Sequence, residues 1–267
     1  MIEIVNLTKR YHRHTAVDDL SLTVEPGEIF GFLGPNGAGK TTTIRMVAGA
    51  LAPTEGRVIL GGFDLAKEPH KAKSLVGYIP DRPFLYEKLS GWEFLEFLAD
   101  LYSVKPDQLR DHGPKLLELF ELLDWRDDLI ENYSHGMKQR LIMAGALLPR
   151  PRILVVDEPM VGLDPRGAKL VMDIFRHLAE REGVAILVST HTMSLASRLC
   201  HRIGIIFKGR LQALGTEDEL RARSGEGGDL EDIFLKITDG GTPQILSEVF
   251  KEEGPAASDE AGRADQS

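Results

Sequence analysis

The stretch of sequence that decides the fold is Gly34-Pro35-Asn36-Gly37-Ala38-Gly39-Lys40-Thr41. It fits the pattern G-x-x-x-x-G-K-[ST], and it stands between the apolar run 29–33 and a helical pattern. A strand, a glycine loop and a helix in this order are the context that a phosphate-binding loop requires. Glycines let backbone amides converge on an anion, and the N-terminus of the helix adds partial positive charge. We therefore predict that the chain binds a nucleoside triphosphate.

The side chains at the end of the loop have separate expected roles. Lys40 is expected to reach the β- and γ-phosphates, and the Thr41 hydroxyl to ligate Mg²⁺. The residues expected to surround the phosphates are Gly34, Pro35, Asn36, Gly37, Ala38, Gly39, Lys40, Thr41 and Thr42.

Acidic side chains follow the apolar run 153–156, which is typical of a strand buried on both faces of a parallel sheet. Ligands of open α/β sheets bind at the carboxyl ends of such strands. Asp157 is expected to hold Mg²⁺, and Glu158 to orient and deprotonate the attacking water. The alternative is a capping acid and its neighbour. His191 follows the next apolar run, 184–188, and either contacts the γ-phosphate or is a polar loop residue.

Tyr11 lies on the basic stretch 9–14 between two strand-like segments. It is either a half-buried strand residue or an aromatic platform for the adenine ring.

Composition excludes several classes of protein. The 267 residues are 42% hydrophobic and 27% charged, as in ordinary globular proteins, and can form one or two domains. A net charge of −9 argues against nucleic acid and anionic lipid as general partners. The single cysteine, Cys200, excludes an intramolecular disulfide and a cysteine metal cluster. Without an apolar run of about 18 residues or a secretory signal, the chain is expected to be cytoplasmic.

The order of patterns predicts an α/β domain with a helical insertion. Period-two and apolar runs predict strands at 2–5, 20–24, 29–33, 58–60, 75–79, 153–156 and 184–188, and a hairpin at 203–214. Helical spacing occurs at 44–51, at 167–181 and between 90 and 146. In that insertion Ser90 and Glu93 form a capping box, and Pro114 is expected to start a second helix.

With these residues in place, the sequence resembles the ATP-binding subunits of ATP-binding cassette (ABC) transporters over residues 1–240. The most diagnostic piece is Tyr133-Ser134-His135-Gly136-Met137-Lys138-Gln139-Arg140, which is similar to the family signature LSGGQ and lies upstream of the acidic strand. Residues 162–165 match the dimer-contacting D-loop. His191 matches the switch histidine, and Tyr11 matches the adenine-stacking aromatic.

The resemblance implies a mechanism. Two such subunits stack head to tail, and each ATP lies between the phosphate loop of one and the signature of the other. Ser134 and the Gly136 amide would contact the γ-phosphate across this interface. Hydrolysis would remove this contact and reopen the dimer, and the opening would drive a separate membrane permease. The implied catalytic residues are Lys40, Glu158 and His191, and the implied metal ligands are Thr41, Asp81 and Asp157.

Three positions depart from the family pattern. Asp81 stands where the family usually has Gln, and adds negative charge near the γ-phosphate. His135 replaces the first signature glycine, and Met137 replaces the signature Gln. The segments 84–89 and 230–235 resemble the ABC-2 type branch, whose members are mostly exporters.

The predicted fold class is therefore α/β: a P-loop NTPase (RecA-like) core with N-terminal antiparallel β strands and an inserted α-helical subdomain. We expect core at 1–83 and 149–224, helical subdomain at 84–148, a helical extension at 225–251 and a disordered tail at 252–267. The expected cofactors are ATP and Mg²⁺. The expected partners are a permease and a second ATP-binding subunit, in a homodimer, with the chain peripheral on the inner face of the membrane. The alternatives are a non-transport ABC ATPase in translation or DNA repair and a soluble P-loop kinase.

Overall fold

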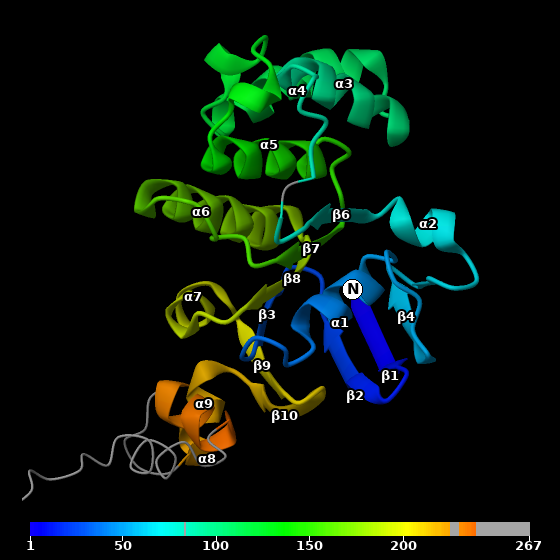
Figure 1. Cartoon of the computed structure of the whole chain (residues 1–267), viewed down its shortest axis with the longest axis vertical. Coiled ribbons are helices and arrows are strands. Elements are labelled where there is room, and N and C mark those ends of the chain that lie inside the picture. Colours follow the sequence, from blue (N-terminus) through cyan, green and yellow to red (C-terminus); the bar gives the residue numbers. More distant parts are fainter. Residues whose placement is uncertain (83, 225–229, 239–267) are drawn as a thin grey trace, which may run out of the picture.

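The computed structural model describes residues 1–82, 84–224 and 230–238. Its central sheet consists of β3 (Ile29–Leu33), β6 (Val76–Ile79), β7 (Ile153–Asp157), β8 (Ala185–Thr190), β9 (Arg202–Phe207) and β10 (Arg210–Gly215). The strand order is β10–β9–β3–β8–β7–β6 (Figure 1). All pairs are parallel except the β9–β10 hairpin. The carboxyl ends of β3, β7 and β8 therefore meet at one edge of the sheet.

Side chains of the central strands alternate between two hydrophobic clusters. Ile153 and Val155 pack with α1 (Lys40–Val47) and the N-terminal strands, whereas Leu154 and Val156 pack with α5 (His135–Leu147) and α6 (Pro165–Glu182). Each strand is apolar throughout because both of its faces are covered. This explains why continuous runs, rather than alternating ones, predicted these strands.

A second, antiparallel sheet lies beside α1. It consists of β1 (Ile2–Tyr11), β2 (His14–Val24), β4 (Glu55–Leu60) and β5 (Phe63–Asp64) in the order β2–β1–β4–β5, followed by the short α2 (Pro69–Lys73). β1 and β2 are longer than the apolar segments 2–5 and 20–24. Pairing continues through bulged polar residues because β1 lies between two partner strands.

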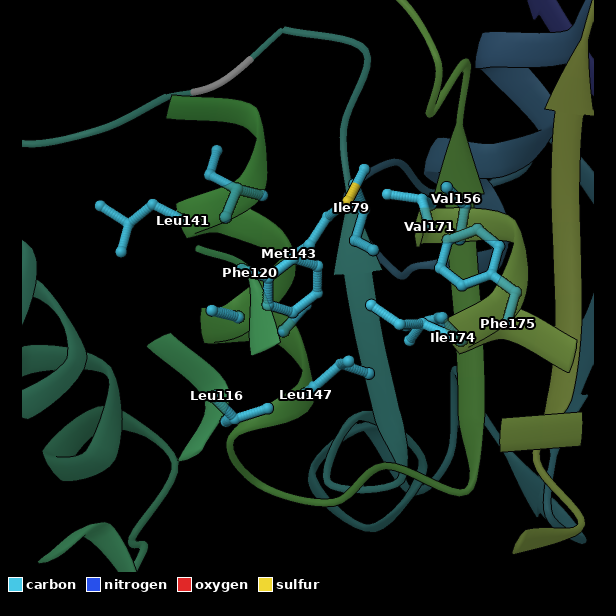
Figure 2. Close-up of a cluster of buried hydrophobic side chains, with 14 of the residues drawn as sticks. Ile79, Leu116, Phe120, Leu141, Met143, Leu147, Val156, Val171, Ile174 and Phe175 are labelled. Carbon is cyan, nitrogen blue, oxygen red and sulfur yellow. The ribbon is translucent and has the colours of Figure 1, made fainter. Parts of the chain in front are cut away.

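The chain between β6 and β7 is helical in its described part. It contains α3 (Gly91–Leu101), α4 (Pro106–Leu119), the 3₁₀ turns Leu123–Trp125 and Ile130–Asn132, and α5. The predicted capping box at Ser90 and Glu93 is confirmed. In the view of Figure 2, Phe120 and Met143 lie on one side of Ile79 and Val156 and Phe175 on the other, and all five belong to one cluster of buried side chains. The helical insertion therefore shares a core with the sheet.

The prediction that Pro114 starts a helix was wrong. Pro114 lies inside α4, whose first residue is Pro106. A proline within a helix removes one backbone hydrogen bond and disfavours the helix. Burial of Leu109 before it and of Leu116 and Leu117 after it keeps α4 continuous, because both halves contribute to the same core. Tertiary packing therefore outweighs the local cost.

Beyond β8 lie α7 (Met193–Leu199), α8 (Glu217–Ser224) and α9 (Leu230–Thr238). Leu220, Leu230 and Ile233 pack in a third cluster with Ile203 and Ile205 of β9. The expected extension at 225–251 contains α9, while residues 225–229 and 239–251 lie outside the described residues, as does the predicted tail at 252–267. The predicted fold class is confirmed, and the domain boundaries stay a prediction.

Candidate nucleotide-binding site

The glycine loop connects the buried strand β3 to α1. Gly37 and Gly39 have φ of +80° and +108°, in the left-handed region where glycine is favoured. At Gly39, which caps α1, a Cβ would also collide with the Ala16 carbonyl oxygen. The loop therefore requires glycine here for its backbone conformation and for its close approach to β2.

Lys40 is folded beneath this loop. Its Nζ donates to the Gly34 carbonyl oxygen at 2.7 Å and to that of Pro35 at 3.3 Å. The side chain is 6% exposed, and burial lowers the pKa of Lys40, while the charges of Glu158 and Asp157 act to raise it. The loop carbonyls thus hold a cation in the anion-binding turn.

Asp157 ends β7 and is fully buried. One of its carboxylate oxygens accepts a hydrogen bond from the Ser189 hydroxyl of β8, and the other, Oδ2, has no hydrogen-bond partner. The pKa of Asp157 is raised above its ordinary value, chiefly by burial. The charges of Asp81 and Glu158 act in the same direction, whereas the hydroxyls of Ser189 and Thr41 act to lower the pKa. An orphaned buried carboxylate oxygen beside Thr41 is a suitable ligand for a hard cation such as Mg²⁺.

Glu158 brings the predicted catalytic residues together. Its Oε1 lies 2.9 Å from His191 Nδ1 and 3.5 Å from Lys40 Nζ, and its side chain is 15% exposed. The backbone φ is +49°, and the amide donates to the Ser189 carbonyl and hydroxyl oxygens at 3.2 and 3.3 Å. Such a backbone conformation in a residue other than glycine costs about 1–3 kcal/mol, and it is often found at functional sites.

A cavity of about 390 Å³ opens beside these groups. Its lining includes the predicted catalytic residue Glu158 and most of the predicted nucleotide-binding residues, namely Tyr11, Pro35, Asn36, Gly37, Gly39, Lys40, Thr41, Thr42 and Asp81. Tyr11 is the last residue of β1 and is half exposed, with Lys9 Nζ 5.2 Å from its ring centroid. Gly34, Ala38 and Asp157 are buried around the cavity rather than lining it.

Ser134 and Gly136 lie in a different cavity. That cavity, of about 420 Å³, is lined by the start of α5, by the loop 162–164 and by the start of α6. Ser134 caps α5, its hydroxyl oxygen accepting from the Met137 amide at 3.3 Å. The hydroxyl proton is free to be donated to another acceptor. One chain therefore does not bring Ser134 and Lys40 into one cavity.

Two of the three departures from the family pattern, Asp81 and His135, line these cavities, whereas Met137 is partly buried against the core. Asp81 lines both the Lys40 cavity and a neighbouring one of about 550 Å³, which His191, Glu158 and His135 also line. His135 packs against Gly162, where a Cβ would collide with the imidazole ring. The glycine in the loop 162–164 thus accommodates the histidine that replaces a signature glycine.

Sequence reasoning missed the role of Ser189. Its hydroxyl holds Asp157, and its carbonyl and hydroxyl oxygens bind the Glu158 amide. The register of β7 and β8 pairs Asp157 with Ser189. A signal was present, because Ser189 follows the apolar run 184–188 at the same edge of the sheet as Asp157.

A glycine loop between a strand and a helix, a lysine beneath it and an acidic pair on the neighbouring strand together define a P-loop nucleoside triphosphatase. The family model described as "ABC transporter" matches residues 17–161, and a model of an AAA domain matches the shorter range 127–197.

Two relatives extend this likeness over most of the chain. The linearmycin resistance ATP-binding protein of Bacillus subtilis (strain 168) is 36% identical over 94% of this chain and 77% of the relative. The daunorubicin resistance ATP-binding protein of Streptomyces coeruleorubidus is 37% identical over 88% of this chain and 73% of the relative.

Two solved structures show the same likeness to ATP-binding subunits. The structure of an ATP binding subunit of an ABC transporter has a TM-score of 0.84 and 32% identity, covering 90% of this chain and all of that one. A dimeric ATP-binding cassette in a post-hydrolysis state, bound to ADP and Pi, has a TM-score of 0.75 and 25% identity, covering 81% of this chain and 98% of that one.

The chain belongs to the ABC transporter family, as an ATP-binding and ATP-hydrolysing subunit. The ATPase of translation or DNA repair and the soluble kinase are not favoured, because these relatives are transporter subunits or resistance proteins. None of the described helices is long and apolar enough to cross a membrane.

Proposed function

We propose that two copies of this chain close head to tail around two ATP molecules and so drive a membrane exporter. One observation carries the proposal: the Lys40 cavity and the Ser134 cavity are separate within one chain. A phosphate bound by Lys40 reaches Ser134 only if the Ser134 belongs to another chain. A helix N-terminus with a free hydroxyl and amide is a good partner for that phosphate.

Within each site the residues divide the work. Lys40 and the loop amides hold the phosphates, and Tyr11 is available to stack on the adenine. Mg²⁺, which would be held by Thr41, Asp157 and Asp81, would neutralise charge on the phosphates when bound. Glu158 accepts the proton of the attacking water, and His191 keeps the Glu158 carboxylate oriented through their 2.9 Å contact.

The homodimer is tested by the mass of the purified Glu158→Gln chain with and without Mg-ATP. We expect an ATP-dependent shift from the monomer mass to twice that mass, because the trapped γ-phosphate bridges the two chains. A monomer that nonetheless binds ATP would contradict the homodimer, and would indicate that the cassette pairs with a different chain.

Export is inferred from the relatives. Several of them are named for drug resistance or for Nod factor export. The likeness of the segments 84–89 and 230–235 to the ABC-2 branch supports the same direction. The chain would then lie against the inner face of the membrane, bound to its permease.

The surface that would bind the permease is an exposed aromatic cluster formed by Phe84, Tyr86 and Phe97. Phe84 is 83% exposed. The ring centroid of Tyr86 lies 6.4 Å from that of Phe84 and 5.2 Å from that of Phe97. Contiguous exposed aromatic side chains are typical of interfaces. Phe84 of the cluster follows Asp81 by three residues, and Asp81 lines the nucleotide cavity, so a bound permease would adjoin that cavity.

Tyr86→Ala is expected to lower the amount of native membrane protein recovered with the tagged chain by about tenfold, the effect of losing one aromatic anchor. ATP binding by the isolated chain should be unchanged. Trp125→Ala is the matched control, because Trp125 is similarly exposed and its ring is not part of the cluster. Equal recovery with both variants would mean that the permease binds elsewhere.

Asp81→Gln is expected to retain ATP hydrolysis, within about threefold of the rate of the unmodified chain. The amide oxygen can still ligate a cation, and one of the negative charges that raise the pKa of Asp157 is removed. Steady-state ATPase rates at saturating Mg-ATP provide the measurement, with Asp81→Asn as the isosteric control. Loss of nearly all activity would instead make the Asp81 carboxylate an essential ligand.

A further inference from the structure

Three charged side chains, from the turn after α4 and from α5 and α6, meet in the lining of the Ser134 cavity. The Glu121 carboxylate accepts hydrogen bonds from Arg140 of α5 at 3.0 Å and from Arg166 of α6 at 2.6 Å. Glu121 follows α4, so this Glu121 bridge joins α4, α5 and α6, of which α5 lies in the middle (Figure 1). The Arg140 side chain is 18% exposed, whereas that of Arg166 is 83% exposed.

The backbone at Glu121 is unfavourable for glutamate. Its φ is +57°, and it comes directly after Phe120, the C-cap of α4. Glycine is the residue favoured at this position, because a side chain in the left-handed region costs free energy. The local conformation thus does not explain the glutamate, whereas its two arginine contacts do.

The bridge joins the two segments that the proposed dimer presents to the second cassette. Arg140 lies on α5 less than two turns beyond Ser134, and Arg166 follows the loop 162–164 by two residues. All three charged residues line the same cavity as Ser134 and Gly162. A movement of the start of α6 relative to α5 would separate Arg166 from Glu121.

We propose that Glu121 is a positioning residue, which holds the loop 162–164 and the start of α5 in a fixed arrangement so that both meet the second cassette together. The inference rests on the proposed homodimer. The ion pair with Arg166 is well exposed and contributes little to folding stability by itself, although networks of several charges contribute more. The Glu121 bridge therefore acts on local order rather than on global stability.

Glu121→Gly and Glu121→Gln separate this role from folding. Glycine adopts φ of +57° without strain, so the melting temperature of Glu121→Gly should not fall, while both variants lose the charged bridge. In the nucleotide-free monomer, we expect amide hydrogen exchange at 162–168 to accelerate about fivefold, the size expected for loss of the exposed ion pair with Arg166. ATP affinity of the monomer should remain unchanged.

Dimerisation is measured in the Glu158→Gln background. Either Glu121 variant should raise the ATP-dependent dimer dissociation constant about fivefold, and adding Arg166→Gln to Glu121→Gln should weaken the dimer little further, because coupled residues act non-additively. Unchanged exchange at 162–168 would overturn the proposal, and so would faster exchange with unchanged dimerisation. If the Glu158→Gln chain stays monomeric with ATP, the proposed homodimer is contradicted. The role of Glu121 in positioning a second copy is then contradicted too, even if faster exchange shows that the bridge orders the loop 162–164.

Discussion

Lys40→Ala is expected to lower the affinity of the chain for ATP by about a hundredfold. The ammonium group is held beneath the loop by the Gly34 carbonyl oxygen, and burial lowers its pKa, so part of its hydration has already been lost. Charge-assisted hydrogen bonds contribute about 1.5–3 kcal/mol each, so two phosphate contacts at the lower end of this range, about 3 kcal/mol together, correspond to the predicted loss. The loss should appear as a weaker dissociation constant in calorimetry, not only as a slower turnover.

Lys67→Ala is the matched control, because Lys67 is an exposed lysine outside the nucleotide cavity. Its ATP affinity should equal that of the unmodified chain. Melting temperatures of both variants should be recorded, since removing Lys40 also leaves Glu158 without its neighbouring cation. An affinity for Lys40→Ala within about threefold of the unmodified value, far less than the charge-assisted bonds require, would mean that the phosphates bind elsewhere.

The local sequence predicted those parts of the candidate site that depend on backbone conformation and on the pattern of apolar residues. The glycine loop requires left-handed backbone at Gly37 and Gly39, and few residue types satisfy that requirement. Asp157 could be predicted because a continuous apolar run predicts a buried parallel strand, whose end position is where ligands bind. In the same way the apolar runs predicted the central sheet, and the capping box predicted the start of α3.

Features that depend on distant parts of the chain could not be predicted. Glu121 and Arg166 are 45 residues apart, and nothing in the local pattern of either one indicates the other. Pro114 has a local preference for a helix start, which burial on both sides of it overrides. The separation of Ser134 from Lys40 likewise depends on how α5 packs on the sheet. In the sequence, only the resemblance to the family indicated this separation.

Glu158→Gln is expected to slow ATP hydrolysis by about a hundredfold to ten-thousandfold, the usual contribution of a general base. Glutamine keeps the size of the side chain and can still contact His191, so the loop should retain its shape. ATP affinity should stay equal or increase, because the substitution removes a negative charge beside the γ-phosphate site. Single-turnover hydrolysis of bound ATP measures the chemical step separately from binding.

His191→Ala and Glu180→Gln complete this comparison. His191 contacts Glu158 and is half exposed, so its loss should slow hydrolysis less than the loss of the carboxylate itself. Glu180 is exposed on α6 outside the nucleotide cavity, and its neutralisation should leave the rate unchanged. If Glu158→Gln hydrolysed ATP at the unmodified rate, the carboxylate would only shape the turn after β7, and its left-handed backbone would reflect that turn. If both Glu158 and His191 are needed, the 2.9 Å contact between them is the part of the site that orients the base.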